Sequence, residues 1–502
     1  MISTRSLSAD RFPSAMLVAL LATTLIANVV IAQLIAQGRI TLLVYLAVCA
    51  AFPLAFLFWR QAMYAVFVVL FVEGYFRNLL NIPDVLLVKD LMLAAIYLRV
   101  LADRANRRSG LIPASPINIP LLAFTGIVFV QTLNPNVASV GQAVVGIRTW
   151  LFYVPLYFVA HEMFREEREL RRFMWFVVLS AVPIGALALR QYFAGPDAYA
   201  SLGEGFEKAL FVTRSAGEGE IVYRPNATFA WSNNFGFFLA LATVLCVGLL
   251  LASKGQVRFI VWSLLAGLVV TNIIENQRTL LLMLPPLLLL MLALRWSTGR
   301  MVTTTLACIL GFVVVAQVAS PGALERMTGL MQNQDNIFNV RAHSYLYSFS
   351  QALESPVGFG TGATSIGARH VVGGIPLIVE FSLSKVLGDL GIVGLAVYLW
   401  LFLALLTSSF GLYRRAARNG LDSLASLAVA IFGFQLLVAY PGYDLAIAAV
   451  PFWFLSGAVG GIAQSAIDNT EESQEASAAA DRGDLELGGS TNEDSRPTEF
   501  PA

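Results

Sequence analysis

Charged and amide side chains stand at the entrances of several long apolar stretches, and these are the residues that could do chemistry. Arg148 opens one such stretch, Arg224 and Asn233 lead into a second, and Arg278 lies in the short turn ENQRT before a third. A charge near the centre of a bilayer costs roughly 2.5–3.5 kcal/mol, so charges in such stretches are functional candidates. Arginine stays protonated, and its planar fork of donors matches carboxylate or phosphate oxygens.

A second group of candidates lies in the segment VRAHSYLYSFSQALESPVGFGTGATS and just after it. Arg341 begins it, aromatic spacing predicts an amphipathic helix over about 340–353, and alternating glycines follow at 358–362. The glycines predict a tight turn and no phosphate-binding loop, because no Gly-Lys-Ser/Thr follows them. Glu380 and Asp389 then lie at the start of a long apolar helix.

Most of these residues also have a plainer structural interpretation. Arg278 is suited to anchoring a helix end at the lipid headgroups, and Arg341 to being an exposed loop charge. Asn233 is a common helix cap, and Asp389 is a common partner of a helix dipole. In the same way Glu73 and Arg77, four residues apart, are spaced for an ion pair within one helix. The sequence leaves these alternatives open.

Composition indicates a membrane protein. Of 502 residues, 57% are hydrophobic and 13% are charged, and mean hydropathy is +0.71, whereas a soluble domain carries about 25% charged residues. A net charge of +1 provides no basic field for nucleic acid. Cys49, Cys246 and Cys308 have no spacing typical of a disulfide framework or a metal site.

The apolar stretches predict an all-α, polytopic bundle of about fourteen transmembrane helices, since a span needs about 20 apolar residues. We place them at 15–32, 40–58, 61–76, 84–101, 118–134, 148–163, 173–190, 227–252, 258–275, 279–296, 301–318, 386–410, 421–440 and 444–464. Together they form one transmembrane domain over 1–467, with a large loop between the eleventh and twelfth spans. The acidic segment 468–502 has too few apolar residues for a core and is expected to be a disordered tail.

Lysine and arginine in short loops set the orientation, because they concentrate on the cytoplasmic side. With a cytoplasmic N-terminus, seven loops rich in these residues all fall on that side. They contain Arg5 and Arg11; Arg60; Arg104, Arg107 and Arg108; Arg165, Arg168, Arg171 and Arg172; Lys254 and Arg258; Arg295 and Arg300; and Arg414, Arg415 and Arg418. Both termini are then cytoplasmic, and the two long loops, about 191–226 and 319–375, are external.

Four patches resemble the O-antigen ligase and polysaccharide polymerase superfamily of bacterial inner membranes. They are GIRTWLFYVPLYFVA with Arg148, NATFAWSNNFGFFLA, ENQRTLLLMLPPLLLL with Arg278, and the segment from Arg341 to Gly362. In ligases the helix after the glycine turn starts with His-Asn, eleven residues before a glycine that matches Gly391. Glu380 occupies the histidine position here, so the chain is more similar to the exopolysaccharide polymerases, and a lipid A core acceptor is in doubt.

This resemblance implies a metal-independent glycosyltransferase without a cofactor, acting on a polyprenyl pyrophosphate-linked oligosaccharide at the external face of the inner membrane. It implies Arg278 and Arg341 as a clamp on the pyrophosphate, Glu380 as the base for the attacking hydroxyl, and Arg148, Arg224, Asn233 and Asp389 as substrate-binding residues. The bilayer and other polysaccharide assembly proteins are the expected partners. The alternatives are a transporter or flippase of lipid-linked glycan, kept open by Pro285 and Pro286 within a span, and a non-catalytic scaffold.

The orientation can be tested directly with reporter fusions. We expect reporters joined at Arg107, Arg168 and Arg415 to be cytoplasmic and reporters at Gly203 and Gln332 to be external, because the positively charged loops fix the orientation. Paired phosphatase and fluorescent reporters measure this in cells. A cytoplasmic signal at Gln332 would contradict both the topology and the site.

Overall fold

The computed structural model describes residues 40–81, 85–107, 112–214, 221–297, 354–365, 382–438 and 446–465, with isolated positions between them. Helices make up 83% of these described residues, which confirms the all-α class. The predicted spans at 15–32 and 301–318 and the tail at 468–502 lie outside the described residues.

Each of the other predicted spans lies largely in helical residues, and the span at 148–163 is divided between two helices. The first half of the chain contains α2 (Ile40–Leu57), α3 (Trp59–Leu80), α4 (Leu86–Asn106), α5 (Asn118–Val130), the 3-10 turn η2 (Gln131–Leu133), α6 (Val140–Leu151), α7 (Leu156–Met163) and α8 (Glu167–Ala200). The second half contains α9 (Glu204–Ala209), α10 (Ser232–Ala252), α11 (Gly255–Glu275), α12 (Arg278–Arg295), α17 (Ser382–Arg418), α18 (Asp422–Val438) and a last helix, Ala446–Ser465.

Seven helices in the described part of the chain are long and apolar enough to cross a membrane, and three shorter ones are also apolar. These helices support a membrane-spanning bundle, but they do not confirm the count of fourteen. One predicted boundary was wrong, because α6 begins at Val140 and not at Arg148. Ser139 caps it by accepting a hydrogen bond from the Gln142 amide, so Arg148 lies two turns inside the helix.

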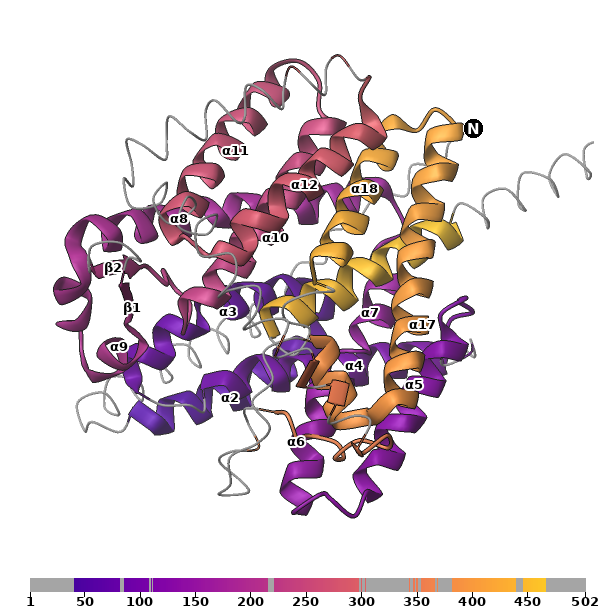
Figure 1. Ribbon diagram of the computed structural model, residues 1–502. Helices are drawn as coiled ribbons and strands as arrows, with labels where there is room; N and C mark the ends of the chain where they lie inside the picture. The colour runs from indigo at the N-terminus through magenta and orange to yellow at the C-terminus, as the bar shows by residue number, and fades with distance from the viewer. Residues whose placement is uncertain are drawn as a thin grey trace, which may run out of the picture.

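The most buried helix of the bundle is α10, which packs against α8, α11, α12 and α18 (Figure 1). Beside it, α17 runs along α5 and α18, and α2, α3 and α4 pack together. The rings of Phe67, Phe173 and Phe454 have centroids 4.8–5.2 Å apart and join α3, α8 and the last helix. Edge-to-face packing of this kind stabilises aromatic pairs beyond their buried area.

Ion pairs join helix ends that our orientation places on the cytoplasmic side. Arg60 at the start of α3 lies 3.7 Å from Glu169 of α8, and Arg295 at the end of α12 lies 2.7 Å from Asp422 of α18. Arg104 of α4 pairs with Glu162 of α7. These contacts agree with the alternation of the helices. We call the opposite end, where α3 ends and α4 and α12 begin, the outer end.

The first long loop is folded in part, which the prediction of a loop over about 191–226 missed. Within it α8 continues to Ala200, α9 follows, and β1 (Phe211–Arg214) pairs antiparallel with β2 (Ile221–Arg224). These elements lie at one side of the bundle in Figure 1. Tyr199, Phe206 and Tyr223 form a small buried cluster there, and burial raises the pKa of the Tyr223 phenol well above its usual range, which keeps it neutral.

A kink in α17 holds the predicted glycine turn. Gly391 has φ of 71°, a conformation that residues with a side chain rarely adopt, and a Cβ there would lie 2.4 Å from the Pro356 carbonyl oxygen. The Ile392 amide donates to that oxygen at 3.0 Å, and the Phe359 amide donates to the Gly388 carbonyl at 2.8 Å. Gly358, Gly360 and Gly362 also have positive φ. The turn and the kink therefore fit together only when glycine occupies these positions.

Substitution of Gly391 by alanine is expected to destabilise the protein. The positive φ alone costs about 1–3 kcal/mol in such a residue, and the clash with the Pro356 carbonyl adds to it. Gly126 of α5 is the matched control, because a Cβ there meets nothing within 4 Å, so Gly126→Ala should be neutral or slightly stabilising. Thermal unfolding in detergent measures both. Equal unfolding temperatures for the two variants would contradict this account of the kink.

Candidate functional site at the outer end of the bundle

A chain of alternating charges crosses three helices at the outer end. Lys89 of α4 is 1% exposed and lies 2.8 Å from a carboxylate oxygen of Glu73 on α3. Its neighbour Asp90 is also buried, and an oxygen of that carboxylate lies 3.9 Å from Lys89 Nζ. Glu73 therefore pairs between helices, and in the described structure the alternative of an ion pair with Arg77 within α3 is wrong. Each charge in this series therefore lies beside a charge of opposite sign, as burial in an apolar bundle requires.

Arg148 ends this chain at the surface. Its Nε and Nη2 donate to the same oxygen of Asp90 at 3.2 and 2.5 Å. Its side chain remains 47% exposed, whereas the Asp90 side chain is 9% exposed. The Tyr153 hydroxyl lies 3.4 Å from the other oxygen of Asp90. Arg148 is thus an anchored guanidinium that is open on one side, which is an arrangement that can bind an anion.

Arg224 is in a different position from Arg148, because it is almost fully buried. Its Nη2 pairs with a carboxylate oxygen of Glu275, and its Nε donates to the Glu275 carbonyl at 3.0 Å. Nη2 also lies 3.4 Å from the amide oxygen of Asn233. The second oxygen of Glu275 accepts from the Gln277 amide at 3.0 Å. Arg224 therefore holds the turn between α11 and α12.

This turn leads directly into Arg278, which is the first residue of α12. Asn276 has φ of 57°, which reverses the chain directly before it. A Cβ on Gly236 of α10 would lie 2.0 Å from the Gln277 amide oxygen, so the turn packs tightly on that helix. The structure thus brings together Arg224, Asn233 and the backbone of Arg278, three of the predicted site residues.

Asp389 is fully occupied by contacts within the chain. Its carboxylate accepts hydrogen bonds from the indole of Trp150 at 2.9 Å and from the amides of Gly362 and Thr364 at 3.1 and 2.7 Å. The side chain is buried in α17. Backbone amides of such a turn commonly cradle an anion, and here that anion is Asp389 itself. Its prediction as a substrate-binding residue stays untested, but the structure gives it the role of holding the glycine turn.

Two helices connect the three parts of the site, which are the linked charges that end at Arg148, the turn held by Arg224 and the glycine turn held by Asp389. On α6, Arg148 reaches Asp90 while Trp150 reaches Asp389, and the hydroxyl of Thr149 lies 3.4 Å from that of Ser365 in the glycine turn. On α3, Glu73 pairs with Lys89 while the next residues contact the strand-to-helix segment before α10. The Tyr75 amide donates to the Thr228 carbonyl at 2.6 Å. The groups therefore share one end of the bundle.

The two remaining predicted catalytic residues, Arg341 and Glu380, lie outside the described residues, as does the side chain of Arg278. His343 is exposed. Within the described part of the chain, no group of three His, Cys, Asp or Glu side chains could hold a metal ion.

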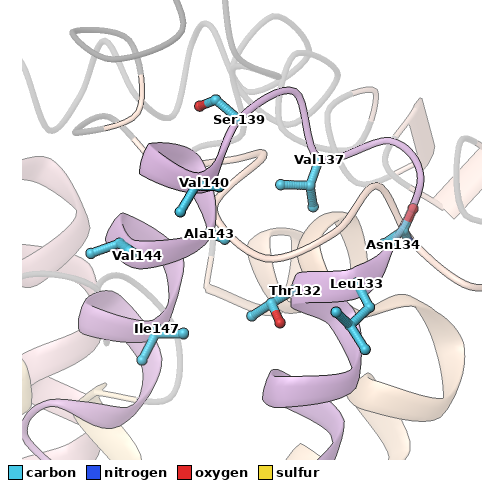
Figure 2. Close-up of a pocket in the computed structure, with 9 residues that line it drawn as sticks. All are labelled: Thr132, Leu133, Asn134, Val137, Ser139, Val140, Ala143, Val144 and Ile147. Atoms are coloured by element: carbon cyan, nitrogen blue, oxygen red, sulfur yellow. The ribbon is translucent and has the colours of Figure 1, made fainter.

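An open groove of about 550 Å³ lies between η2 and α6. Figure 2 shows Leu133, Val137 and Ile147 among the residues that line it, beneath the loop that joins the two helices. Its polar lining residues are Thr132, Asn134 and Ser139. Because the lining contains no titratable group, the groove offers an apolar contact surface and no acid or base.

The sequence missed several residues that position the site. Glu275, Lys89 and Asp90 were not among the predicted site residues. Trp150 was not singled out, although it follows Arg148 by two residues. Spacing along one helix could not identify these partners, since each lies on a different element.

No family model matches this sequence, and no curated protein matches it. The resemblance to the ligase and polymerase superfamily therefore rests on the order and composition of its motifs.

The buried Arg224–Glu275 pair gives a test of this geometry. We expect Arg224→Met or Glu275→Leu alone to destabilise the protein by about 3–5 kcal/mol, because each leaves an unpaired buried charge. The double variant should recover most of that loss, since both charges are then gone. Thermal unfolding in detergent, followed by tryptophan fluorescence, measures the effect. Additive losses in the double variant would show that the two residues do not act as a pair.

Proposed function

We propose that this protein transfers or polymerises a glycan carried on polyprenyl pyrophosphate, at the external face of a bacterial inner membrane, with both of its termini in the cytoplasm. The observation that carries the proposal is Arg148, a half-exposed guanidinium anchored by a buried carboxylate at the outer end of an apolar bundle. A pyrophosphate at the membrane surface is the ligand such a group suits, because its oxygens match the guanidinium fork.

In this reaction an acceptor hydroxyl attacks the anomeric carbon of the donor sugar. The glycosidic bond forms, the bond to the lipid pyrophosphate breaks, and the hydroxyl proton passes to a base. Glu380 is the proposed base. Arg278 and Arg341 are proposed to stabilise the negative charge on the leaving pyrophosphate, and Arg148 to assist them. The donor is already activated, so the step needs no nucleotide, cofactor or metal.

The other predicted substrate-binding residues are proposed to have different roles. Arg224 is buried against Glu275 and supports the turn that begins α12, which supports a role in placing Arg278 and not in direct contact with the substrate. Asn233 is exposed beside it and remains able to contact a sugar. The acceptor distinguishes a polymerase from a ligase. The glutamate at the position of the ligase histidine favours the polymerase.

Transport of a lipid-linked glycan is the second candidate function. The buried charges Lys89 and Asp90 and the partly buried Glu73 lie within helices of the bundle, and such intramembrane charges commonly mark transport pathways. In the described residues these charges lie near the outer end, where an enzyme site at the membrane surface also needs them. A flippase moves its substrate across vesicles without forming a glycosidic bond, so the two functions give different products.

Substitutions at the proposed site should abolish transfer. Arg278→Ala and Arg341→Ala are each expected to lower turnover by about 10²–10³, and lysine should rescue poorly because it lacks the planar fork. Glu380→Gln removes the base and should lower turnover by about 10²–10⁴ with less effect on donor binding. The assay is polymer formation from purified lipid-linked oligosaccharide in detergent.

Arg418→Ala is a matched control, since it removes an arginine at the opposite end of α17. It should leave polymer formation unchanged. Near-normal polymer from all three site variants would refute the proposed reaction. Movement of the lipid-linked glycan across vesicles in the absence of polymer would then favour the transporter.

A further inference from the structure

The anchoring of Arg148 leaves one defined edge of its guanidinium facing outward. Asp90 takes the edge formed by Nε and Nη2 through a single carboxylate oxygen, at 3.2 and 2.5 Å. Among the described residues, the contacts of Arg148 with Asp90 use Nε and Nη2 and leave the edge that includes Nη1 open, and the side chain is 47% exposed. Two parallel N–H groups on such an edge match two oxygens of one phosphate.

Asp90 is itself fixed by a group of the α6–α7 turn, by a group of its own helix and, through that group, by α3. The Tyr153 hydroxyl of the α6–α7 turn lies 3.4 Å from its second oxygen, and Lys89 Nζ lies 3.9 Å from that same oxygen. Lys89 is in turn held by Glu73 of α3 at 2.8 Å. The four linked side chains are two carboxylates and two cations, so their summed formal charge is zero.

The order of these charges explains how Arg148 can bind a ligand without leaving Asp90 unpaired. A buried carboxylate without a partner is strongly destabilising. When Arg148 shares its charge with a phosphate, Lys89 still faces Asp90 from 3.9 Å. A guanidinium that is already oriented also loses less side-chain entropy when the ligand binds.

We propose that Asp90 and Lys89 are positioning residues for a lipid pyrophosphate: Asp90 aims the free edge of Arg148 at a phosphate, and Lys89 holds the Asp90 carboxylate in place beneath it. This inference rests on the proposed function for the identity of the ligand. It adds a specific prediction, namely that removal of Asp90 weakens binding only when Arg148 is present.

Binding of farnesyl pyrophosphate to the full-length purified protein in detergent tests this, with farnesol as the uncharged control ligand. Arg148→Ala and Asp90→Asn should each weaken binding by about tenfold to a hundredfold, the range for a hydrogen bond to a charged group. Asp90→Asn added to Arg148→Ala should cause no further loss. Lys89→Met should weaken binding, and Lys89→Arg should restore most of it.

The matched control is Asp103→Asn. Asp103 lies on α4 as well and accepts from Arg99 Nε at 3.2 Å, but at the other end of the helix. This variant should bind like the original protein. Should Asp90→Asn fail to fold, Asp90→Glu keeps the charge and moves it by one methylene. It should weaken binding severalfold at an unchanged unfolding temperature.

The outcomes separate the two proposals. If the original protein binds farnesyl pyrophosphate no better than farnesol, the proposed function fails, and this inference fails with it. If the original protein binds it well, but Asp90→Asn weakens binding equally with and without Arg148, then Asp90 does not act through Arg148. That result, or a folded Asp90→Glu variant with unchanged affinity, overturns the inference and leaves the proposed function standing.

Discussion

A charge inside an apolar bundle is stable only when it is paired with an opposite charge or held by hydrogen bonds, and the outer end of this protein is organised by that requirement. Lys89 is 1% exposed between Glu73 and Asp90, and Glu275 is equally buried beside Arg224. Glu73 and Lys89 come from different elements, as do Asp90 and Arg148 and also Arg224 and Glu275, so each of these pairs fixes the position of one element against another. The segment before α10, the turn before α12 and the start of α4 all have their places set in this way.

The same requirement decides which predicted residue is free to meet a ligand. Arg224 and Asp389 are both buried and both satisfied by neighbours within the chain. The backbone amides of Gly362 and Thr364 in the glycine turn donate to Asp389, so those amides are not available to a phosphate. Arg148 differs, because its counter-ion is buried while the guanidinium is half exposed. The proposed anion at the outer end would therefore meet the guanidinium of Arg148, and not the backbone of the glycine turn.

The sequence predicted the features that depend on local pattern. Apolar length predicted the helices, alternating glycines predicted the turn, and charge in short loops predicted which helix ends meet, as Arg60 with Glu169 illustrates. It failed where a feature depends on distant partners. The spacing of Glu73 and Arg77 suggested a pair within one helix, yet Lys89 on the next helix lies 2.8 Å from Glu73. The start of α6 was misplaced because its first turns are less apolar and its cap, Ser139, was not recognised.

The arrangement also bears on the choice between enzyme and transporter. A transport pathway needs polar groups that continue through the bundle, whereas the linked charges Glu73, Lys89, Asp90 and Arg148 lie close to one end. Towards the other end, the Phe67, Phe173 and Phe454 rings close the space between α3, α8 and the last helix. A bundle that is packed with aromatic rings inside and charged at its outer end is suited to holding a lipid headgroup at the surface. That arrangement favours chemistry at the membrane face over passage through the protein.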